Sequence, residues 1–225
     1  MMEKHGCLLL HGFTGGPFEV EPLAEYLRSL GYECRVPTLP GHDQELHELG
    51  RVSWRDWLDA AAGEAYEMSR RYTTMDVIGF SMGGLLSAYV ANRFPVRRLV
   101  MLNAAAIYVS PMMLIRDLAE RIKEHDWEHW GRVKKVPLPA TFQFMKLARY
   151  AKQCELGRVA VPTLIAQGQK DQIVHPRSAR YIYNRLQGDK ELVYFAQSRH
   201  MLCFEPDAPE VFRSVGRFLS PSHTF

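Results

Sequence analysis

The sequence predicts a single α/β domain in which helices flank a mostly parallel sheet of about six strands. Its 225 residues are enough for one well-packed core. Short β-rich runs alternate with helical patterns along the chain, an order typical of a parallel sheet covered by helices. The composition agrees, because 47% of the residues are hydrophobic, 24% are charged, and no repeat or low-complexity tract occurs.

Six short runs are the expected strands. In order they are "CLLLH" (7–11), "ECRVPT" (33–38), "MDVIGF" (75–80), "RLVMLN" (98–103), "PTLIAQ" (162–167) and "ELVYF" (191–195). Between them, apolar residues at helical spacing predict helices. The first helix carries Val20, Leu23, Ala24, Leu27 and Leu30, with Pro22 near its start and Gly31 just past its end. Similar patterns cover 54–68, 85–94, 179–186 and 211–219, and all these apolar faces are interpreted as core.

The alternation breaks in the middle of the chain. From Ala104 to Arg158 no strand-like run appears, although the sheet resumes at Pro162. We therefore expect residues 1–104 and 158–225 to form the core and residues 105–157 to be an insertion. Two interpretations of this insertion stay open, a plain helical crossover with an apolar inner face or a cap that closes over an apolar substrate.

The net charge of the chain and its N-terminal sequence bear on binding to nucleic acid and to membranes. The formal net charge is +3, and basic residues are interspersed with acids, as in "RIKEHDWEH", so nucleic acid is not an expected partner. The apolar run in "MMEKHGCLLLHGF" is too short for a signal peptide or a spanning helix. We expect a cytoplasmic protein without stable membrane anchoring. No oligomeric state is predicted.

The four cysteines indicate neither a disulfide framework nor a zinc site. Cys7, Cys34, Cys154 and Cys203 lie in unlike contexts without CxxC spacing. We expect buried free thiols rather than disulfides or a zinc site, and no metal or cofactor.

The stretch "GFSMGG" (79–84) is the first candidate for chemistry. Gly-x-Ser-x-Gly alone is a common pattern, but here a strand-like run precedes it and a helical run follows it. That context is the strand–turn–helix setting of a nucleophile elbow. Ser81 is therefore the candidate nucleophile, with Gly79 and Gly83 leaving room for a strained turn and a close crossing.

A serine hydroxyl needs a base, and the base needs an orienting acid. In this setting the chain order is Ser, then Asp or Glu, then His. Asp171 follows the fifth predicted strand and His200 follows the last, so both fall at the carboxyl edge of the sheet. His175 is better explained as a surface or packing residue, and His42 comes too early to be the base. Asp189 precedes the last strand rather than following it.

The glycine-rich stretch "LLLHGFTGGP" (8–17) follows the first strand and predicts an oxyanion hole. Its donors are expected to be the backbone N–H groups of Phe13 and of Met82, the residue after the nucleophile. His11 and Gly12 are expected to shape this loop rather than react. A phosphate cradle is the competing interpretation, but neither GxGxxG nor GxxxxGK[ST] is present.

With these motifs the chain resembles the α/β-hydrolase superfamily, and within it the small bacterial carboxylesterases and monoacylglycerol lipases. "HGFTG" is similar to that group's oxyanion loop, "GFSMGG" to its elbow, and "PTLIAQGQKDQIVHPRSARYIYNRL" to its acid loop and following helix. The likeness runs along almost the whole chain. It implies ester hydrolysis without a cofactor and favours the interpretation of residues 105–157 as a small helical cap.

One departure from the group is visible, because its catalytic histidine commonly follows a glycine, whereas Arg199 precedes His200 here. Altered loop geometry and preference for an anionic substrate both stay open.

The expected function is that of a serine carboxylesterase acting on short- to medium-chain esters, with monoacylglycerols as possible substrates. Another α/β-hydrolase activity, such as thioester or carbon–carbon bond hydrolysis, and a non-catalytic binding role are the alternatives. Pocket lining and core packing stay open as interpretations of Ile173, Met201, Met112, Met113 and Trp127.

Overall fold

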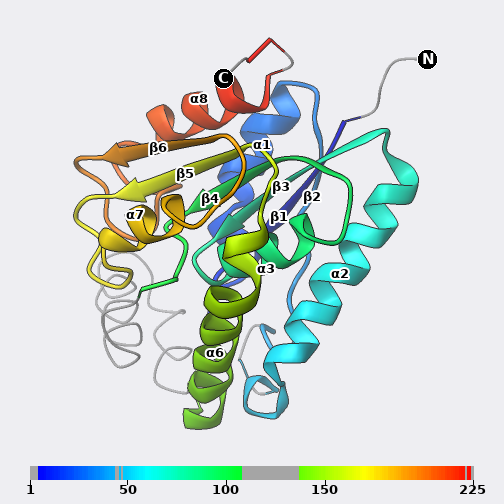
Figure 1. Ribbon diagram of the computed structural model, residues 1–225, viewed down its shortest axis with the longest axis vertical. Coiled ribbons are helices and arrows are strands. Elements are labelled where there is room, and N and C mark those ends of the chain that lie inside the picture. Colours follow the sequence, from blue (N-terminus) through cyan, green and yellow to red (C-terminus); the bar gives the residue numbers. More distant parts are fainter. Residues whose placement is uncertain (1–4, 44–45, 47, 108–136, 221, 224–225) are drawn as a thin grey trace.

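The computed structural model describes residues 5–43, 46, 48–107, 137–220 and 222–223. These residues form a six-stranded sheet with every neighbouring pair parallel, which confirms the predicted fold class (Figure 1). The strands are β1 (His5–Leu10), β2 (Glu33–Arg35), β3 (Thr74–Phe80), β4 (Val96–Leu102), β5 (Thr163–Gly168) and β6 (Lys190–Phe195). Strand β2 is shorter than its predicted run, because Pro37 has no N–H to donate to a neighbouring strand.

The strand order, β2-β1-β3-β4-β5-β6, reverses direction between β1 and β3. From β1 the chain steps outward to β2, then crosses back to β3 and continues the other way. In open α/β sheets the loops at such a point diverge and leave a crevice at the carboxyl ends of the strands. The loop after β1 and the turn after β3 therefore meet at the place where this fold class binds ligands.

Helices α1 (Glu21–Ser29) and α8 (Ala208–Leu219) cover one face of the sheet. Alternate strand residues, such as Leu9, Ile78 and Val100, point to this face and pack in one cluster with the two helices. Gly31 ends α1 with a φ of +92°, as its predicted position past the helix implies. The assignment of Leu30 to the core was wrong, since it is 50% exposed beyond the last turn of α1.

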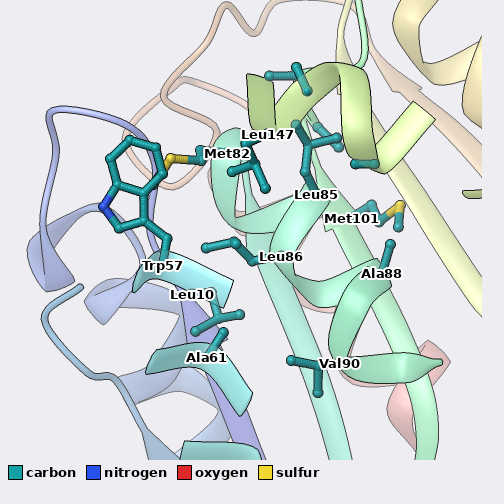
Figure 2. Packing of buried hydrophobic residues seen from close by; sticks show 14 of the residues in the cluster. Leu10, Trp57, Ala61, Met82, Leu85, Leu86, Ala88, Val90, Met101 and Leu147 are labelled. Carbon is teal, nitrogen blue, oxygen red and sulfur yellow. The ribbon is translucent and has the colours of Figure 1, made fainter. Parts of the chain in front are cut away.

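The opposite face carries α2 (Trp54–Arg71), α3 (Met82–Ala91), α6 (Leu138–Tyr150) and α7 (Arg177–Tyr183). Figure 2 shows side chains of α3 at the centre of this cluster, with Leu10, Trp57, Ala61, Met101 and Leu147 around them. Helix α3 is buried along almost its entire length. A buried central helix holds the turn at its start rigidly against the sheet.

Short helical turns complete the described chain. They are the 3₁₀ turns η1 (Pro17–Glu19), η2 (Leu49–Arg51) and η5 (Leu156–Arg158), and the π-helical turn η4 (Ala151–Glu155). The α2 N-terminus is closed by a capping box, in which Ser53 and Asp56 each accept from the other's backbone N–H.

Residues 108–136 of the predicted insertion lie outside the described residues. The described remainder is 105–107 and the stretch from residue 137 on, in which α6 buries Phe144 and Leu147 in the core beside α2 and α3. Glu155 in η4 is fully buried and receives two hydrogen bonds from Arg93, at the end of α3. The second half of the predicted insertion is thus anchored beside α3.

The four cysteines are free, but only Cys7 and Cys203 are buried. Cys154 is exposed, so its predicted burial was wrong. Within the described part of the chain, no helix is both long and apolar enough to cross a membrane.

Candidate active site

Ser81 lies on a strained turn between β3 and α3. Its φ of 53° and ψ of −112° are unusual for a residue with a side chain. The Ser81 N–H donates to the carbonyl of Leu102 at 2.9 Å, and the Ser81 carbonyl accepts from Gly84 at 3.1 Å and Ala105 at 3.2 Å. Neighbouring backbone thus holds the turn from both sides, as a strained conformation requires.

The glycines flanking Ser81 are required by close packing. A Cβ on Gly79 would overlap the carbonyl of Gly83, and a Cβ on Gly83 would overlap the carbonyl of Leu10. Strand β3, the start of α3 and the end of β1 therefore approach one another by backbone alone. This is the packing that the glycine pattern predicts.

His200 and Asp171 reach Ser81 from two other loops. The distance from His200 Nε2 to Ser81 Oγ is 3.2 Å, and that from His200 Nδ1 to Asp171 Oδ2 is 2.8 Å. All three residues are at most 5% exposed. The structure brings together the three side chains selected from the sequence, in the order in which a serine nucleophile, its base and its acid would act.

Asp171 is held by the backbone of its own loop. Its second oxygen, Oδ1, accepts from the N–H groups of Ile173 at 2.9 Å and Val174 at 3.0 Å. Gln167 approaches Asp171 Oδ2 at 3.4 Å. These donors hold the carboxylate in place and leave Oδ2 aimed at the imidazole. Ile173 is itself 1% exposed and packs in the α3-side core.

Asn103 was missed by the sequence analysis. It follows β4, is fully buried and has a φ of 44°. Its Nδ2 donates to the carbonyls of Arg199 at 2.9 Å and His200 at 2.6 Å, while its Oδ1 accepts from Gly168 at 2.8 Å. One amide side chain therefore ties the loop that carries His200 to the end of β5, the strand that precedes Asp171. An asparagine directly after a buried strand was the available signal.

The glycine-rich loop after β1 folds over the same edge of the sheet. Phe13 is 5% exposed, and its ring stacks on Phe144 of α6 with centroids 5.1 Å apart. Met82 is the first residue of α3 and is fully buried. In the described chain, no protein acceptor is assigned to the backbone N–H of Phe13 or of Met82. An oxyanion hole requires backbone donors that are free to bind the carbonyl oxygen of a substrate.

His11 braces this loop. Its Nδ1 donates to the carbonyl of Gly12 at 2.9 Å, and its Nε2 accepts from the N–H of Leu39 at 3.0 Å. Those bonds require the neutral tautomer with the proton on Nδ1. Burial, together with the neighbouring His42, lowers the pKa of His11 to about 3, so the ring stays neutral near pH 7. The expectation that His11 shapes the loop agrees with these contacts.

Of the remaining predicted pocket residues, Met201 lies among the described residues. Met201 packs against the cluster on the α1 and α8 face. Met112, Met113 and Trp127 lie outside the described residues. Among the residues that are described, no group of three or more His, Cys, Asp and Glu side chains could hold a metal ion.

A parallel sheet with a serine on a strained strand-to-helix turn, and an imidazole and a carboxylate reaching it from the last two strand ends, defines the α/β-hydrolase class. The chain belongs to the alpha/beta hydrolase family, whose family model matches residues 7–215.

Two characterised relatives match nearly the whole chain. The thermostable monoacylglycerol lipase of Bacillus sp. (strain H-257) is 31% identical over 96% of this chain and 90% of its own length. The carboxylesterase of Bacillus subtilis (strain 168) is 26% identical over 94% of this chain and 91% of its own length. A solved structure from the metagenome-derived lipolytic enzymes LipS and LipT superposes with a TM-score of 0.80 at 25% identity, covering 96% of this chain and 94% of its own.

Proposed function

We propose that the protein is a serine carboxylesterase that hydrolyses short- to medium-chain carboxylic esters, monoacylglycerols among them, through an acyl-enzyme. The observation that carries the proposal is the line of contacts from Ser81 Oγ through the His200 ring to Asp171, at 3.2 and 2.8 Å. The relatives named monoacylglycerol lipase and carboxylesterase support the choice of esters as substrates.

In the proposed mechanism, Ser81 Oγ attacks the ester carbonyl while His200 Nε2 takes the hydroxyl proton. Asp171 holds the Nδ1–H tautomer and stabilises the imidazolium. The negative charge on the carbonyl oxygen is bound by the N–H groups of Phe13 and Met82. His200 then returns the proton to the leaving alcohol, and water attacks the acyl-serine by the reverse route.

The substrate range is proposed from the relatives and the apolar insertion. Residues 105–157 would form a small helical cap, and Met112, Met113 and Trp127 would form its wall against the acyl chain, with Ile173 and Met201 nearer the catalytic loops. A thioesterase or a carbon–carbon hydrolase would use the same serine, histidine and aspartate. Only the substrates turned over separate these activities.

The test is turnover of para-nitrophenyl esters with acyl chains of about two to sixteen carbons, since each buried methylene adds about 0.8 kcal/mol of binding. We expect activity with short and medium chains, and a loss on the order of a millionfold in Ser81→Ala. Ser69→Ala on α2, whose hydroxyl only bonds the carbonyl of Tyr66, is the matched control and should behave as wild type. Ester turnover that survives in Ser81→Ala would refute the mechanism. If activity rose through the longest acyl chains, the proposed short- to medium-chain substrate range would be replaced by one of long-chain esters.

A further inference from the structure

Glu19 places a buried carboxyl group inside the oxyanion loop. It is the last residue of η1 and only 4% exposed, and its Oε2 accepts from the N–H of Gly12 at 2.8 Å. A Cβ on Gly15 would overlap this carboxyl group, and one on Gly12 would lie 3.1 Å from Oε2 and 3.2 Å from Ser81 Cβ. The carboxyl group therefore fills the hollow of the loop, close to the candidate nucleophile.

The contact between Glu19 and Gly12 affects the orientation of the proposed oxyanion donor, the backbone N–H of Phe13. The N–H of Gly12 is held by Glu19, and its carbonyl is held by His11 Nδ1 at 2.9 Å. The peptide bond from Gly12 to Phe13 is planar and trans, so the direction of the Gly12 carbonyl also sets the direction of the Phe13 N–H. His11 thus restrains the Gly12–Phe13 peptide directly, and Glu19 restrains the preceding His11–Gly12 peptide, so the two bonds hold the backbone on both sides of the Gly12 Cα.

Few ionisable groups surround the Glu19 carboxyl group among the described residues, and its pKa is shifted. In the described chain no lysine or arginine forms a salt bridge with it, and the titratable groups coupled to it are His200 and Cys203. Burial raises the pKa of Glu19 to about 7, against the backbone hydrogen bonds of Gly12 and Gly16 and the positive charge of His200, which lower it.

We propose that Glu19 is a positioning residue for the ester hydrolysis proposed above, on which this inference rests: its buried carboxylate accepts from the Gly12 N–H and thereby fixes the oxyanion loop. The group acts through Gly12 and does not touch the substrate. The oxyanion loop contributes more to the transition state than to the bound substrate, so kcat falls and KM does not when Glu19 is changed.

The experiment compares wild type with Glu19→Gln, which keeps an acceptor for Gly12 without the charge, and Glu19→Met, which keeps neither. Glu21→Gln is the matched control, because Glu21 lies two residues on and pairs with Arg28 at the surface. Kinetics with a para-nitrophenyl ester are measured on variants shown to be folded by circular dichroism. Independently of turnover, the Gly12 amide resonance is followed by NMR from pH 5 to 9.

We expect kcat to fall about tenfold in Glu19→Gln and about a hundredfold in Glu19→Met, the lower bound for losing an oxyanion donor, with KM almost unchanged. The Gly12 resonance should titrate near pH 7 in wild type and in Glu21→Gln but not in Glu19→Gln. A folded Glu19→Met with wild-type kcat, or a Gly12 titration that persists in Glu19→Gln, overturns the proposal. Absence of ester turnover in wild type, with the Gly12 titration intact, overturns instead the proposed function and with it the catalytic meaning of Glu19.

Discussion

His200 donates from Nδ1 to Asp171 Oδ2 across 2.8 Å, and Asp171 keeps its other oxygen for two backbone N–H groups of its own loop. Oδ1 of the carboxylate is therefore occupied by backbone donors, and Oδ2 is left to accept from the imidazole. This arrangement selects the tautomer in which His200 Nε2 has a lone pair facing Ser81. The relation predicts that the charge and acceptor geometry of Asp171 matter more than its volume.

Asp171→Asn should lower kcat about ten-thousandfold, because the amide can donate to Nδ1 and so favours the wrong imidazole tautomer. KM should change little, since the substrate does not contact this side chain in the proposed mechanism. Steady-state ester kinetics check the prediction, with Asp189→Asn, an exposed position, as control. A variant that retains more than about a tenth of wild-type kcat would contradict the role of Asp171.

Gly83→Ala and Gly63→Ala should change stability in opposite directions although both glycines are helical. The new methyl group at position 83 would overlap the carbonyl of Leu10, whereas position 63 on α2 has no atom within 4 Å. We expect Gly83→Ala to lose at least about 3 kcal/mol or fail to fold, and Gly63→Ala to gain about 0.5–1 kcal/mol. Urea unfolding measures both. Equal stabilities would mean that the β1–α3 approach is looser than described.

Asn103→Asp should reduce kcat by up to about a hundredfold, because an acceptor would replace the donor that holds the carbonyls of Arg199 and His200. The base would shift relative to Ser81 while the acyl site stayed intact, so KM should change little. Asn184→Asp, at the exposed end of α7, is the control. Ester kinetics on folded protein check this, and wild-type kcat in Asn103→Asp would show that His200 is positioned by other contacts.

Glu19 should make stability depend on pH near neutrality. Its pKa rises from 4.5 to about 7 on folding, so the folded state holds the proton more tightly than the unfolded state. The resulting stability is present below about pH 4.5 and is lost as the pH rises through about 7, a total of about 3 kcal/mol. Glutamine does not titrate, and so Glu19→Gln should gain stability relative to wild type by about that amount between pH 4.5 and 8.

Urea unfolding of Glu19→Gln and wild type at several pH values measures this difference directly. His11 and His42, whose pKa values are lowered to about 3 and about 4, are present in both proteins and cancel in the comparison. A difference that stays constant with pH would show that the Glu19 carboxyl group does not titrate in this range.

Much of the site was predictable because its signals are local. The elbow around Ser81 shows itself as glycines at fixed spacing between a strand-like run and a helical run. Asp171 and His200 follow from chain order, because each comes directly after a strand whose carboxyl end must lie at the same edge of a parallel sheet. These inferences need only the period of the hydrophobic pattern and the direction of the strands.

The supporting contacts were not predictable in the same way. Asn103 bonds to His200, 97 residues away, and to Gly168, 65 residues away, and no spacing rule links such positions. Glu19 is only seven residues from Gly12, yet its sequence context resembles that of a solvated glutamate at a helix start. Its burial depends on how the glycine loop folds back over Ser81.

The sequence by itself therefore determined the fold class, the strand runs and the positions from which three side chains converge, because periodicity and chain direction are properties of neighbouring residues. Only the tertiary structure decided which polar groups lose contact with water. Desolvation depends on every element packed around a group, and it is desolvation that raises the pKa of Glu19, keeps His11 neutral and makes the amide of Asn103 a buried tie between two loops.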